Sequence, residues 1–442
     1  MKVRVYGLFL GVLFLINANG QVVQLDEAIR IGLQKNYDIL VQKETSALAA
    51  NDNRFAFGAF LPQINANGSY NRNSLDSRNQ TFGNDTIRSV ETVRSGAKST
   101  TINGNVQLLW TIFDGTRMFA TRKRIEELAV LGEINVRNQM MNTTANIISN
   151  YFNIIRQKQQ LRAVQELMKV SEERVKLAEK KLQVGTGGKP ELLQAKVDLN
   201  SQRTAILSQE TLIQQLKDQL NGSLGMELPD VYDVSDSIPI NLSITMEEII
   251  NGIENSNQTV LAAKKNIDIA TLVVRENRAS RSPVINLTSS YTFNQQENEL
   301  ATSPVAQKFT RGQGFNYGAT ISFPILNGMN INRLIGTAKI NLDRQKLIYS
   351  QQLTIAVVGV RNAFINYDNA KKTLLINEEN ILLARENVTI ALEGFKRGVT
   401  TALDLRTAQQ SLADAYNLLI AARYNAKVSE TELLRLKGAL LN

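Results

Sequence analysis

The sequence contains one pattern twice, and this internal repeat limits the folds that the chain can adopt. Asn36 and Asn257 lie in similar segments 221 positions apart, and a second set of matched positions is 213 apart, so one deletion of eight residues explains both spacings. The matched glycines of the second set are Gly115 and Gly328, Gly185 and Gly398, and Gly225 and Gly438. A repeat of this length predicts one structural unit used twice. We place the two copies at 21–225 and 226–442.

Residues 1–20 have the pattern of a secretory signal. Lys2 and Arg4 precede an apolar run, and Ala18-Asn19-Gly20 is a small-x-small cleavage pattern. The alternative is a membrane anchor, but an apolar run of about 12 residues is shorter than the ~20 that a spanning helix needs. We therefore expect cleavage after Gly20 and an exported protein. No later run is long and apolar enough to predict a transmembrane helix.

The composition weakens most enzyme classes. The chain has no His and no Cys, which excludes disulfides, thiolate nucleophiles, imidazole metal ligands and a Ser–His–Asp triad. We therefore predict no enzymatic activity, no metal and no cofactor. The net charge of +9 is weak evidence for nucleic-acid binding, because an exported chain has little access to DNA.

Each repeat is predicted to contain a long helix and a returning helix. The long helices are placed at 116–184 and 330–397, and the returning helices at 190–221 and 402–436. Apolar residues recur every seven positions in both long helices, which predicts packed, nearly parallel helices, although an ordinary helical bundle would show the same seam. At ~1.5 Å per residue the first long helix is about 104 Å long, which predicts a rod. The seam positions are Ile154, Leu161, Met168, Val175 and Leu182, matched by Tyr367, Leu374, Ile381, Val388 and Phe395.

A further helix opens each repeat, and two strands lie between it and the long helix. The opening helices are placed at 25–60 and 246–281, and the strands at 60–72, 100–113, 283–294 and 314–325. The strands alternate apolar and polar residues and contain no charge in their interiors, which is the pattern of transmembrane β-strands. A soluble amphipathic sheet is the alternative. The expected lipid-facing residues are Ile102, Val106, Leu108, Trp110, Ile112, Leu287, Tyr291, Tyr317, Ile321 and Phe323.

Four membrane strands require an oligomer. The smallest membrane barrels have about eight strands, and an open edge in lipid leaves backbone groups unpaired at several kcal/mol each. The polar stretches 72–99 and 295–312 are expected to be external loops. The predicted fold class is therefore a mixed α+β membrane protein, in which a β-barrel shared by several copies continues into a tube of long helices.

At this point the chain resembles the TolC family of outer-membrane efflux and secretion channels, over Val22 to Asn442. The resemblance rests on an ordered and duplicated set of motifs. They are Leu25-Asp26-Glu27-Ala28-Ile29 with Asn36, Leu61-Pro62-Gln63-Ile64, Phe113-Asp114-Gly115, and the two glycine-containing turns at 182–186 and 395–400. Some relatives carry a lipid on an N-terminal Cys, whereas this chain has none.

The resemblance implies a homotrimer with a 12-stranded barrel in the outer membrane and a periplasmic coiled-coil α-barrel. It implies a passive exit duct of a tripartite efflux or type I secretion system, opened at its helical tips by a periplasmic adaptor protein and an inner-membrane pump. The alternative function is a periplasmic coiled-coil adaptor or scaffold, which would need no lipid-facing strands.

The resemblance also assigns candidate site residues. Asp404 matches an aspartate that lines the periplasmic constriction in relatives, and Glu191 is its repeat partner. Relatives often have a second aspartate one turn later, where this chain has Thr407 beside Arg406. Both acids also suit the first turn of a helix through the helix dipole alone, so this structural interpretation stays open. The adaptor-docking candidates are Val184, Gly185, Thr186, Arg397, Gly398, Val399 and Thr400.

Overall fold

The computed structural model describes residues 21–82, 89–226, 232–299 and 307–441. The predicted secretory signal lies outside the described residues. The described chain forms two compact units. Unit 1 comprises residues 21–46, 132–263 and 349–442, and unit 2 comprises 47–131 and 264–348. Several long helices contribute one part to each unit, and the two units are described separately below.

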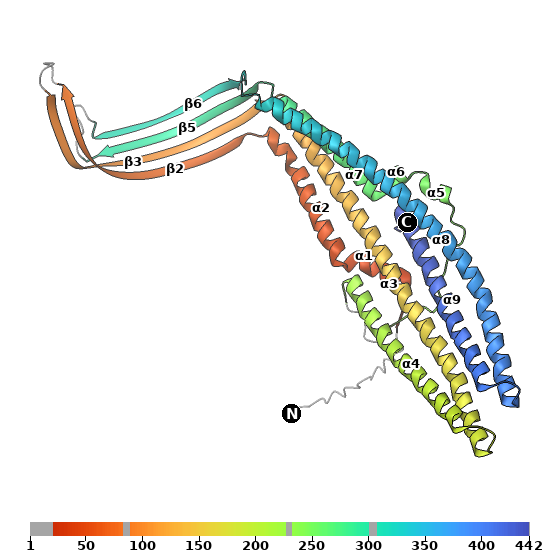
Figure 1. Cartoon of the computed structure of the whole chain (residues 1–442). Helices are drawn as coiled ribbons and strands as arrows, with labels where there is room; N and C mark the ends of the chain where they lie inside the picture. Colours follow the sequence, from red (N-terminus) through yellow and green to blue (C-terminus); the bar gives the residue numbers. More distant parts are fainter. Residues whose placement is uncertain (1–20, 83–88, 227–231, 300–306, 442) are drawn as a thin grey trace, which may run out of the picture. The chain divides into compact units, whose positions relative to one another are not determined.

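The two halves of the chain have a similar order of elements (Figure 1). The first half contains β1 (Gln21–Val23), α1 (Leu25–Lys35), α2 (Tyr37–Phe55), η1 (Ala56–Phe60), β2 (Gln63–Phe82), β3 (Ser89–Phe113), α3 (Arg117–Gln183) and α4 (Lys189–Leu224). The second half contains β4 (Tyr232–Val234), α5 (Met246–Ile250), α6 (Ile253–Ser256), α7 (Gln258–Ala279), β5 (Val284–Asn298), β6 (Phe309–Ser322), α8 (Asn330–Arg397) and α9 (Ala402–Lys437).

Unit 2 is built around a four-stranded antiparallel sheet in the order β2-β3-β5-β6. The strand order places β2 and β6 at the two edges. Ion pairs join α3 to α7 in this unit: Arg124 Nε lies 2.8 Å from Glu276 Oε1, and Lys265 Nζ lies 2.7 Å from Glu127 Oε2. The two halves of the chain therefore contribute two strands each to one sheet, and α3 and α7 are joined beside it by ion pairs.

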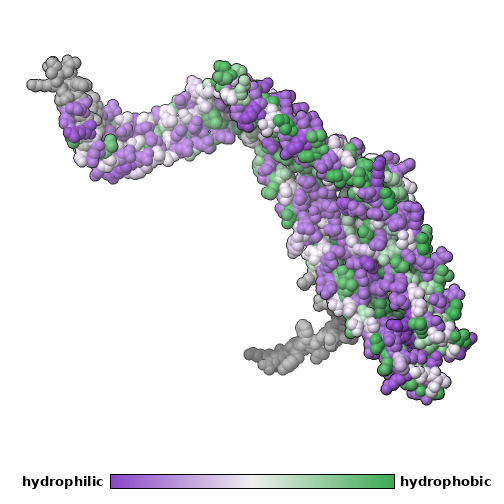
Figure 2. All heavy atoms as spheres, viewed as in Figure 1, coloured by the Kyte–Doolittle hydropathy of each residue, from purple (hydrophilic) through white to green (hydrophobic). Residues whose placement is uncertain are grey.

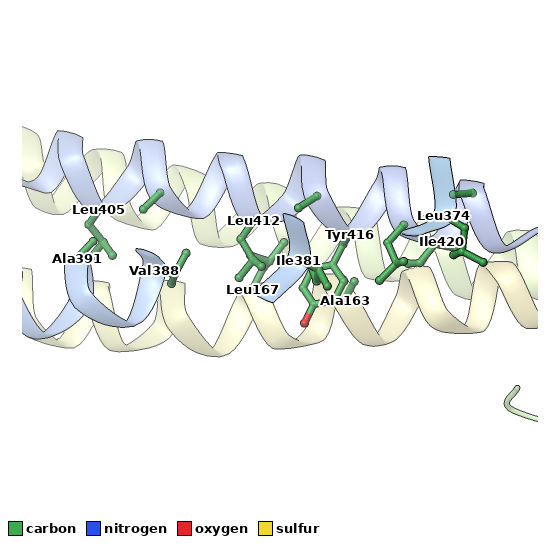
Figure 3. Packing of buried hydrophobic residues seen from close by; sticks show 14 of the residues in the cluster. Ala163, Leu167, Leu374, Ile381, Val388, Ala391, Leu405, Leu412, Tyr416 and Ile420 are labelled. Carbon is green, nitrogen blue, oxygen red and sulfur yellow. The ribbon is translucent and has the colours of Figure 1, made fainter. Parts of the chain in front are cut away.

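One apolar core of unit 1 lies between α3, α8 and α9, and a second lies between α1, α3, α4, β1 and β4. Figure 3 shows Ala163 and Leu167 of α3 against apolar side chains of α8 and α9. All five seam positions of α8 are buried, from Tyr367 to Phe395. On α3 only Ile154 and Val175 are fully buried and the other three are partly buried. The heptad side chains are therefore more completely buried on α8 than on α3.

The opening helices are broken, which corrects the prediction of continuous helices over 25–60 and 246–281. The first is divided into α1, α2 and η1, and the second into α5, α6 and α7. Asn36 and Asn257 lie at two of the breaks, where the backbone is extended, with ψ of 127° and 117°. Because Asn side chains bond to nearby backbone amides, they favour helix starts over helix interiors.

Asn36 and Asn257 form two copies of the same joint. The Asn36 Oδ1 accepts bonds from the amides of Asp38 and Ile39, at 3.0 and 3.2 Å, and its Nδ2 donates to the Ser223 carbonyl. Asn257 accepts from the amides two and three residues on, at the same two distances, and donates to the carbonyl of Leu436. Each asparagine thus starts one helix and binds the end of another.

A glycine completes each joint. Gly225 and Gly438 have φ of 73° and 79°. A Cβ at these positions would lie 2.3 Å from the Lys35 carbonyl oxygen and 2.4 Å from that of Ser256. Only glycine fits such a close approach at this φ. The joint explains why the asparagines and glycines recur in both repeats.

The strands of the first hairpin are longer than predicted. β2 and β3 have 20 and 25 residues, so most of the expected external loop 72–99 is strand. The pairing continues past a register shift between Leu75 and Ser77, because backbone pairing does not require apolar side chains. β6 ends at Ser322, earlier than expected, because Pro324 has no amide to donate.

In the part of the chain that the structure describes, no helix has the length and hydropathy needed to cross a membrane.

The joint predicts a specific loss of stability. Replacing Asn257 by Ala removes an N-cap and leaves the Leu436 carbonyl without its donor, which costs about 1–3 kcal/mol. We expect the N257A protein to lose its helical circular dichroism at a lower temperature than the wild type. Asn251, an exposed residue nearby, provides the control N251A. Equal melting temperatures of the two variants would contradict the role of the joint.

Candidate functional site

The two helical hairpins of unit 1 end in the same turn. Gly185 follows α3 and Gly398 follows α8, and both have φ of 78°. The Thr186 amide donates to the Lys181 carbonyl at 2.9 Å, and the Val399 amide donates to that of Gly394 at the same distance. These are Schellman bonds, which satisfy carbonyls at a helix end. No atom would contact a Cβ at either glycine, so backbone conformation alone selects glycine here.

The predicted docking residues form the exposed surface of these turns. Val184 is 72% exposed and Val399 is 81% exposed. Thr400 is the exception, because its hydroxyl donates to the Ala391 carbonyl at 3.0 Å and its side chain packs against Gly394. Two exposed apolar side chains at the ends of two neighbouring hairpins are available for contact with another protein.

Asp404 has a structural role in the first turn of α9. Thr401 is the N-cap, and its amide and hydroxyl both donate to Asp404 Oδ2 at 2.8 Å. The Asp404 amide donates back to the Thr401 hydroxyl, which completes a capping box. The bond from the Thr401 amide lowers the pKa of Asp404 below its ordinary value. The carboxylate is therefore ionised, exposed and held in place.

The repeat partner of Asp404 is in a different environment. Glu191 lies in the first turn of α4, whose N-cap, Gly188, supplies no side-chain cap. The Glu191 Oε1 atom is buried without a hydrogen-bond partner among the described residues. The two acids that the repeat aligns therefore do not act as equivalents within one copy of the chain.

Thr407 and Arg406 lie one turn into α9 and are both exposed. The Thr407 hydroxyl donates to the Leu403 carbonyl of its own helix at 3.0 Å. Arg406 turns instead towards α4, with its Nε 3.5 Å from Asp198 Oδ2. One turn on from Asp404 the structure thus places the hydroxyl of Thr407, with the positive charge of Arg406 beside it.

A charged cluster that the sequence did not indicate connects the two hairpins. Arg174 of α3 has a side chain only 5% exposed, and it forms an ion pair with Asp198 of α4. Its Nη1 donates to Gln409 Oε1 of α9 at 3.1 Å, and Gln409 donates to Ser171. These residues line a cavity of about 320 Å³ between the three helices. Asp198 therefore holds α4 to both α3 and α9.

The charge of Asp198 is stabilised within this cluster. Burial opposes its ionisation, but hydrogen bonds from Arg174 and Gln194 outweigh this and lower the pKa of Asp198. The apolar contact of α4 with α3 here is small, since the buried cluster contains only Val175, Ala195 and Leu199. The ion pairs therefore carry a large share of the α4 contacts in this region. Spacing could not reveal them, because the three charges lie on three helices.

In unit 2 the register of the sheet aligns the expected lipid-facing residues on one face. Directly paired residues of neighbouring strands share a face, and one row joins Ala66, Val106, Tyr291 and Phe315. On the opposite face, polar residues and glycines predominate over 63–71, 99–113, 284–296 and 312–322, with Leu109 and Val284 as apolar members. The predicted residues aligned on the apolar face are Ile102, Val106, Leu108, Trp110, Leu287, Tyr291, Tyr317 and Ile321.

Two predicted lipid-facing residues differ from this alignment. A register shift between Thr111 and Phe113 leaves Ile112 without a cross-strand partner and pairs Phe113 with Ile285 instead. Phe323 lies one residue beyond the end of β6. Near this end of the sheet, the Trp110 indole donates to the Phe60 carbonyl at 2.9 Å. An aromatic ring with one bonded polar atom suits a boundary between apolar and wet surroundings.

No group of residues suited to hold a metal ion occurs in the described ranges. Unit 2 offers an amphipathic sheet, and unit 1 offers exposed turns with a fixed carboxylate. These are surfaces for contact with other molecules.

Comparison with known proteins identifies the family. The sequence model of the outer membrane efflux protein family matches residues 29–226 and 249–439. The chain is 24% identical to the outer membrane efflux protein BepC of Brucella suis, over 91% of this chain and 81% of that one. It is 22% identical to the outer membrane protein TolC of Escherichia coli, over 78% and 70% of the two chains.

Solved structures show the same fold. The outer membrane protein VceC from Vibrio cholerae matches with a TM-score of 0.74 at 17% identity, covering 94% of this chain and 96% of that one. The channel CusC matches with a TM-score of 0.75 at 18% identity, covering 94% and 92%. These relatives are channel proteins rather than enzymes. The chain therefore belongs to the outer membrane efflux protein family, as an efflux channel of the outer membrane with a periplasmic extension.

Proposed function

We propose that the chain is one subunit of a homotrimeric exit duct, which a periplasmic adaptor and an inner-membrane pump open at the helical tips. The observation that carries the proposal is the sheet of unit 2. It is uncharged and amphipathic over the segments 63–71, 99–113, 284–296 and 312–322. A lipid-facing apolar side and a wet polar side are the two surfaces of a membrane barrel wall.

The two edges of the sheet support an assembly of three copies. β2 and β6 each have a partner strand on one side only. Edge strands with unpaired backbone groups do not persist in lipid. Three copies joined edge to edge form a closed 12-stranded barrel. The adaptor or scaffold alternative gives no reason for a sheet of this kind.

The helices also support an assembly. α8 carries a second apolar seam beside its buried one, with exposures between 54% and 65%. These side chains are Leu375, Ile376, Leu382, Leu383 and Ile390. Hydrophobic residues are visible along the exposed surfaces of the helices in Figure 2. Seven-residue spacing of exposed aliphatic residues is typical of a helix that packs against another chain.

Opening of the duct is proposed to occur at the hairpin turns. Exposed Val184 and Val399 provide the surface that an adaptor contacts, and Asp404 contributes a ring of three carboxylates at the constriction. Such a ring favours cations. Opening moves the hairpin of α8 and α9 away from that of α3 and α4, so it breaks the contact of Arg406 with Asp198.

The Asp404 ring predicts a selectivity. In planar bilayers the D404N channel should have a lower preference for cations than the wild type, measured as the reversal potential in a KCl gradient. T407D should raise the preference, because it adds a second ring one turn on. The control is D343N, which removes one negative charge from α8 instead of α9. Unchanged selectivity in both site variants would remove Asp404 from the constriction.

The turns predict a separation of docking from assembly. G185L and G398L strain a backbone with φ of 78° without creating a clash. We expect both to abolish export, measured as drug sensitivity, while heat-resistant trimers remain in the membrane. The control is G222L, at an exposed glycine inside α4. Loss of the trimers in G185L and G398L would assign the glycines to folding alone.

The Arg406–Asp198 contact predicts easier opening when it is removed. An exposed ion pair contributes up to about 1 kcal/mol, so R406Q should raise the open population up to about fivefold. The readout is the mean conductance of channels in planar bilayers. R406K keeps the charge and should stay closer to the wild type. Equal conductance of R406Q and wild type would exclude this contact from gating.

A further inference from the structure

Beyond its uncharged part, the apolar face of the sheet ends in basic residues. The first charged residue past this part is Arg72 on β2, Lys98 on β3 and Arg311 on β6, and only β5 has an acid there, Glu297. By chain connectivity, this end of each strand points away from the helix that follows or precedes the sheet. Three of four strands therefore place a positive charge first beyond the uncharged part, on the side distant from the helices.

The register places these charges on the apolar face. Arg311 pairs with Gln295, which pairs with Ile102, and Ile102 pairs with Tyr70. Arg72 pairs with Thr100 in the next row, and Lys98 pairs with Ser74 in the row after that. Because residues in register share a face, all three basic residues lie on the side that carries the apolar and aromatic residues.

Aromatic residues accompany the basic residues. Tyr70, Tyr291, Phe293 and Phe315 occupy the last apolar rows of this face. The Arg311 guanidinium lies 5.1 Å from the centroid of the Phe293 ring. Along the strands the apolar rows are thus followed by rows in which aromatic and basic residues occur together, with Tyr70 in the Arg311 row and Phe309 in the Arg72 row. Membrane barrels have an apolar band with aromatic girdles at its limits, and lipid phosphates lie just beyond.

The depth of the basic residues fits a lipid headgroup. Ile321 and Arg311 are ten residues apart on β6, or about 34 Å along a strand at ~3.4 Å per residue. A tilt of about 40° reduces this to roughly 26 Å along the membrane normal, close to the ~25 Å apolar band of such barrels. Arg311 therefore lies one band height from Ile321.

The basic residues are incompletely neutralised within the chain. Arg72 forms an ion pair with Glu299 at 2.8 Å. Lys98 and Arg311 have no ion pair among the described residues, and both are exposed. Glu297 lies in the same row as Arg72 and diagonally from Arg311, so two acids, Glu297 and Glu299, accompany the three basic residues. The remaining positive charge favours an anion from outside the chain.

From this arrangement we propose that Arg72, Lys98 and Arg311 bind the phosphate groups of lipid A in the outer leaflet. The inference rests on the proposed function, because it requires the apolar face to be in contact with lipid. The helices are periplasmic, so the residues first beyond the uncharged part, on the side distant from the helices, lie in the outer leaflet, where lipid A carries its phosphates. Arginine and lysine are the side chains that bind phosphate most strongly.

The first test uses the wild-type trimer and needs no variant. Purified full-length protein in detergent is incubated with phosphorylated lipid A or with dephosphorylated lipid A, and the lipid bound per chain is measured by mass spectrometry. We expect at least threefold more of the phosphorylated form to bind. Excess inorganic phosphate should compete weakly, because the acyl chains also contact the apolar face. Equal binding of the two lipids would overturn the inference.

The second test assigns the residues. The double variant K98Q/R311Q should bind at least threefold less phosphorylated lipid A than the wild type, whereas K98R/R311K should retain binding. R333Q/K339Q makes the same charge change on exposed residues of α8 and is the matched control. Wild-type binding by K98Q/R311Q would overturn the assignment.

The two proposals fail in different ways. Heat-resistant trimers in the outer membrane are assayed in parallel for the wild type and each variant. Absence of wild-type trimers from the membrane would overturn the proposed function. Membrane-inserted trimers that show no preference for lipid phosphate would overturn only the lipid A site.

Discussion

Backbone hydrogen bonding at the edges of the sheet is the constraint on which the proposed assembly depends. β2 and β6 each leave one row of amides and carbonyls without a partner strand. In water such groups bond to solvent, but in lipid each costs several kcal/mol. An amphipathic, uncharged sheet therefore cannot exist in a membrane as a single copy. In the proposed assembly, β2 of one copy pairs with β6 of the next, which satisfies the backbone of both edges and places the polar face towards a lumen.

Apolar packing and ion pairs hold the helices of unit 1 together in different places. α3, α8 and α9 share one apolar core, and Leu216, Leu220 and Leu224 of α4 lie in a second one with α1 and α3. Nearer the hairpin turn, α4 has only a small apolar cluster and Asp198 between Arg174 and Arg406. A buried arginine that loses its carboxylate is strongly destabilised, while the exposed Arg406 contact is weak. Near the hairpin turn Arg174 thus helps to hold α4 against α3, and the exposed Arg406 contact is the weaker of the two ion pairs of Asp198.

Several features were predictable because they depend on residues near one another in the chain. The heptad positions of α8, the glycine turns after α3 and α8, and the alternating strands follow from local periodicity and backbone preference. The breaks in the opening helices were missed, although Asn36 and Asn257 were the anchors of the repeat. These two asparagines could have indicated the breaks, because an asparagine inside a predicted helix can cap the start of a new helix as well as pack within one.

The sequence by itself determined the duplicated unit, the helices and turns, and the alternation of the strands, since these depend on local side-chain pattern and chain length. Tertiary structure decided the strand register, which shifts at Ile112, and the pairing of β2 with β3 into the expected loop 72–99. It also decided that Asp198 lies between arginines of two other helices, and that Arg72, Lys98 and Arg311 share a face. These features depend on contacts between segments far apart in the chain, and the local sequence pattern does not specify which segments make contact.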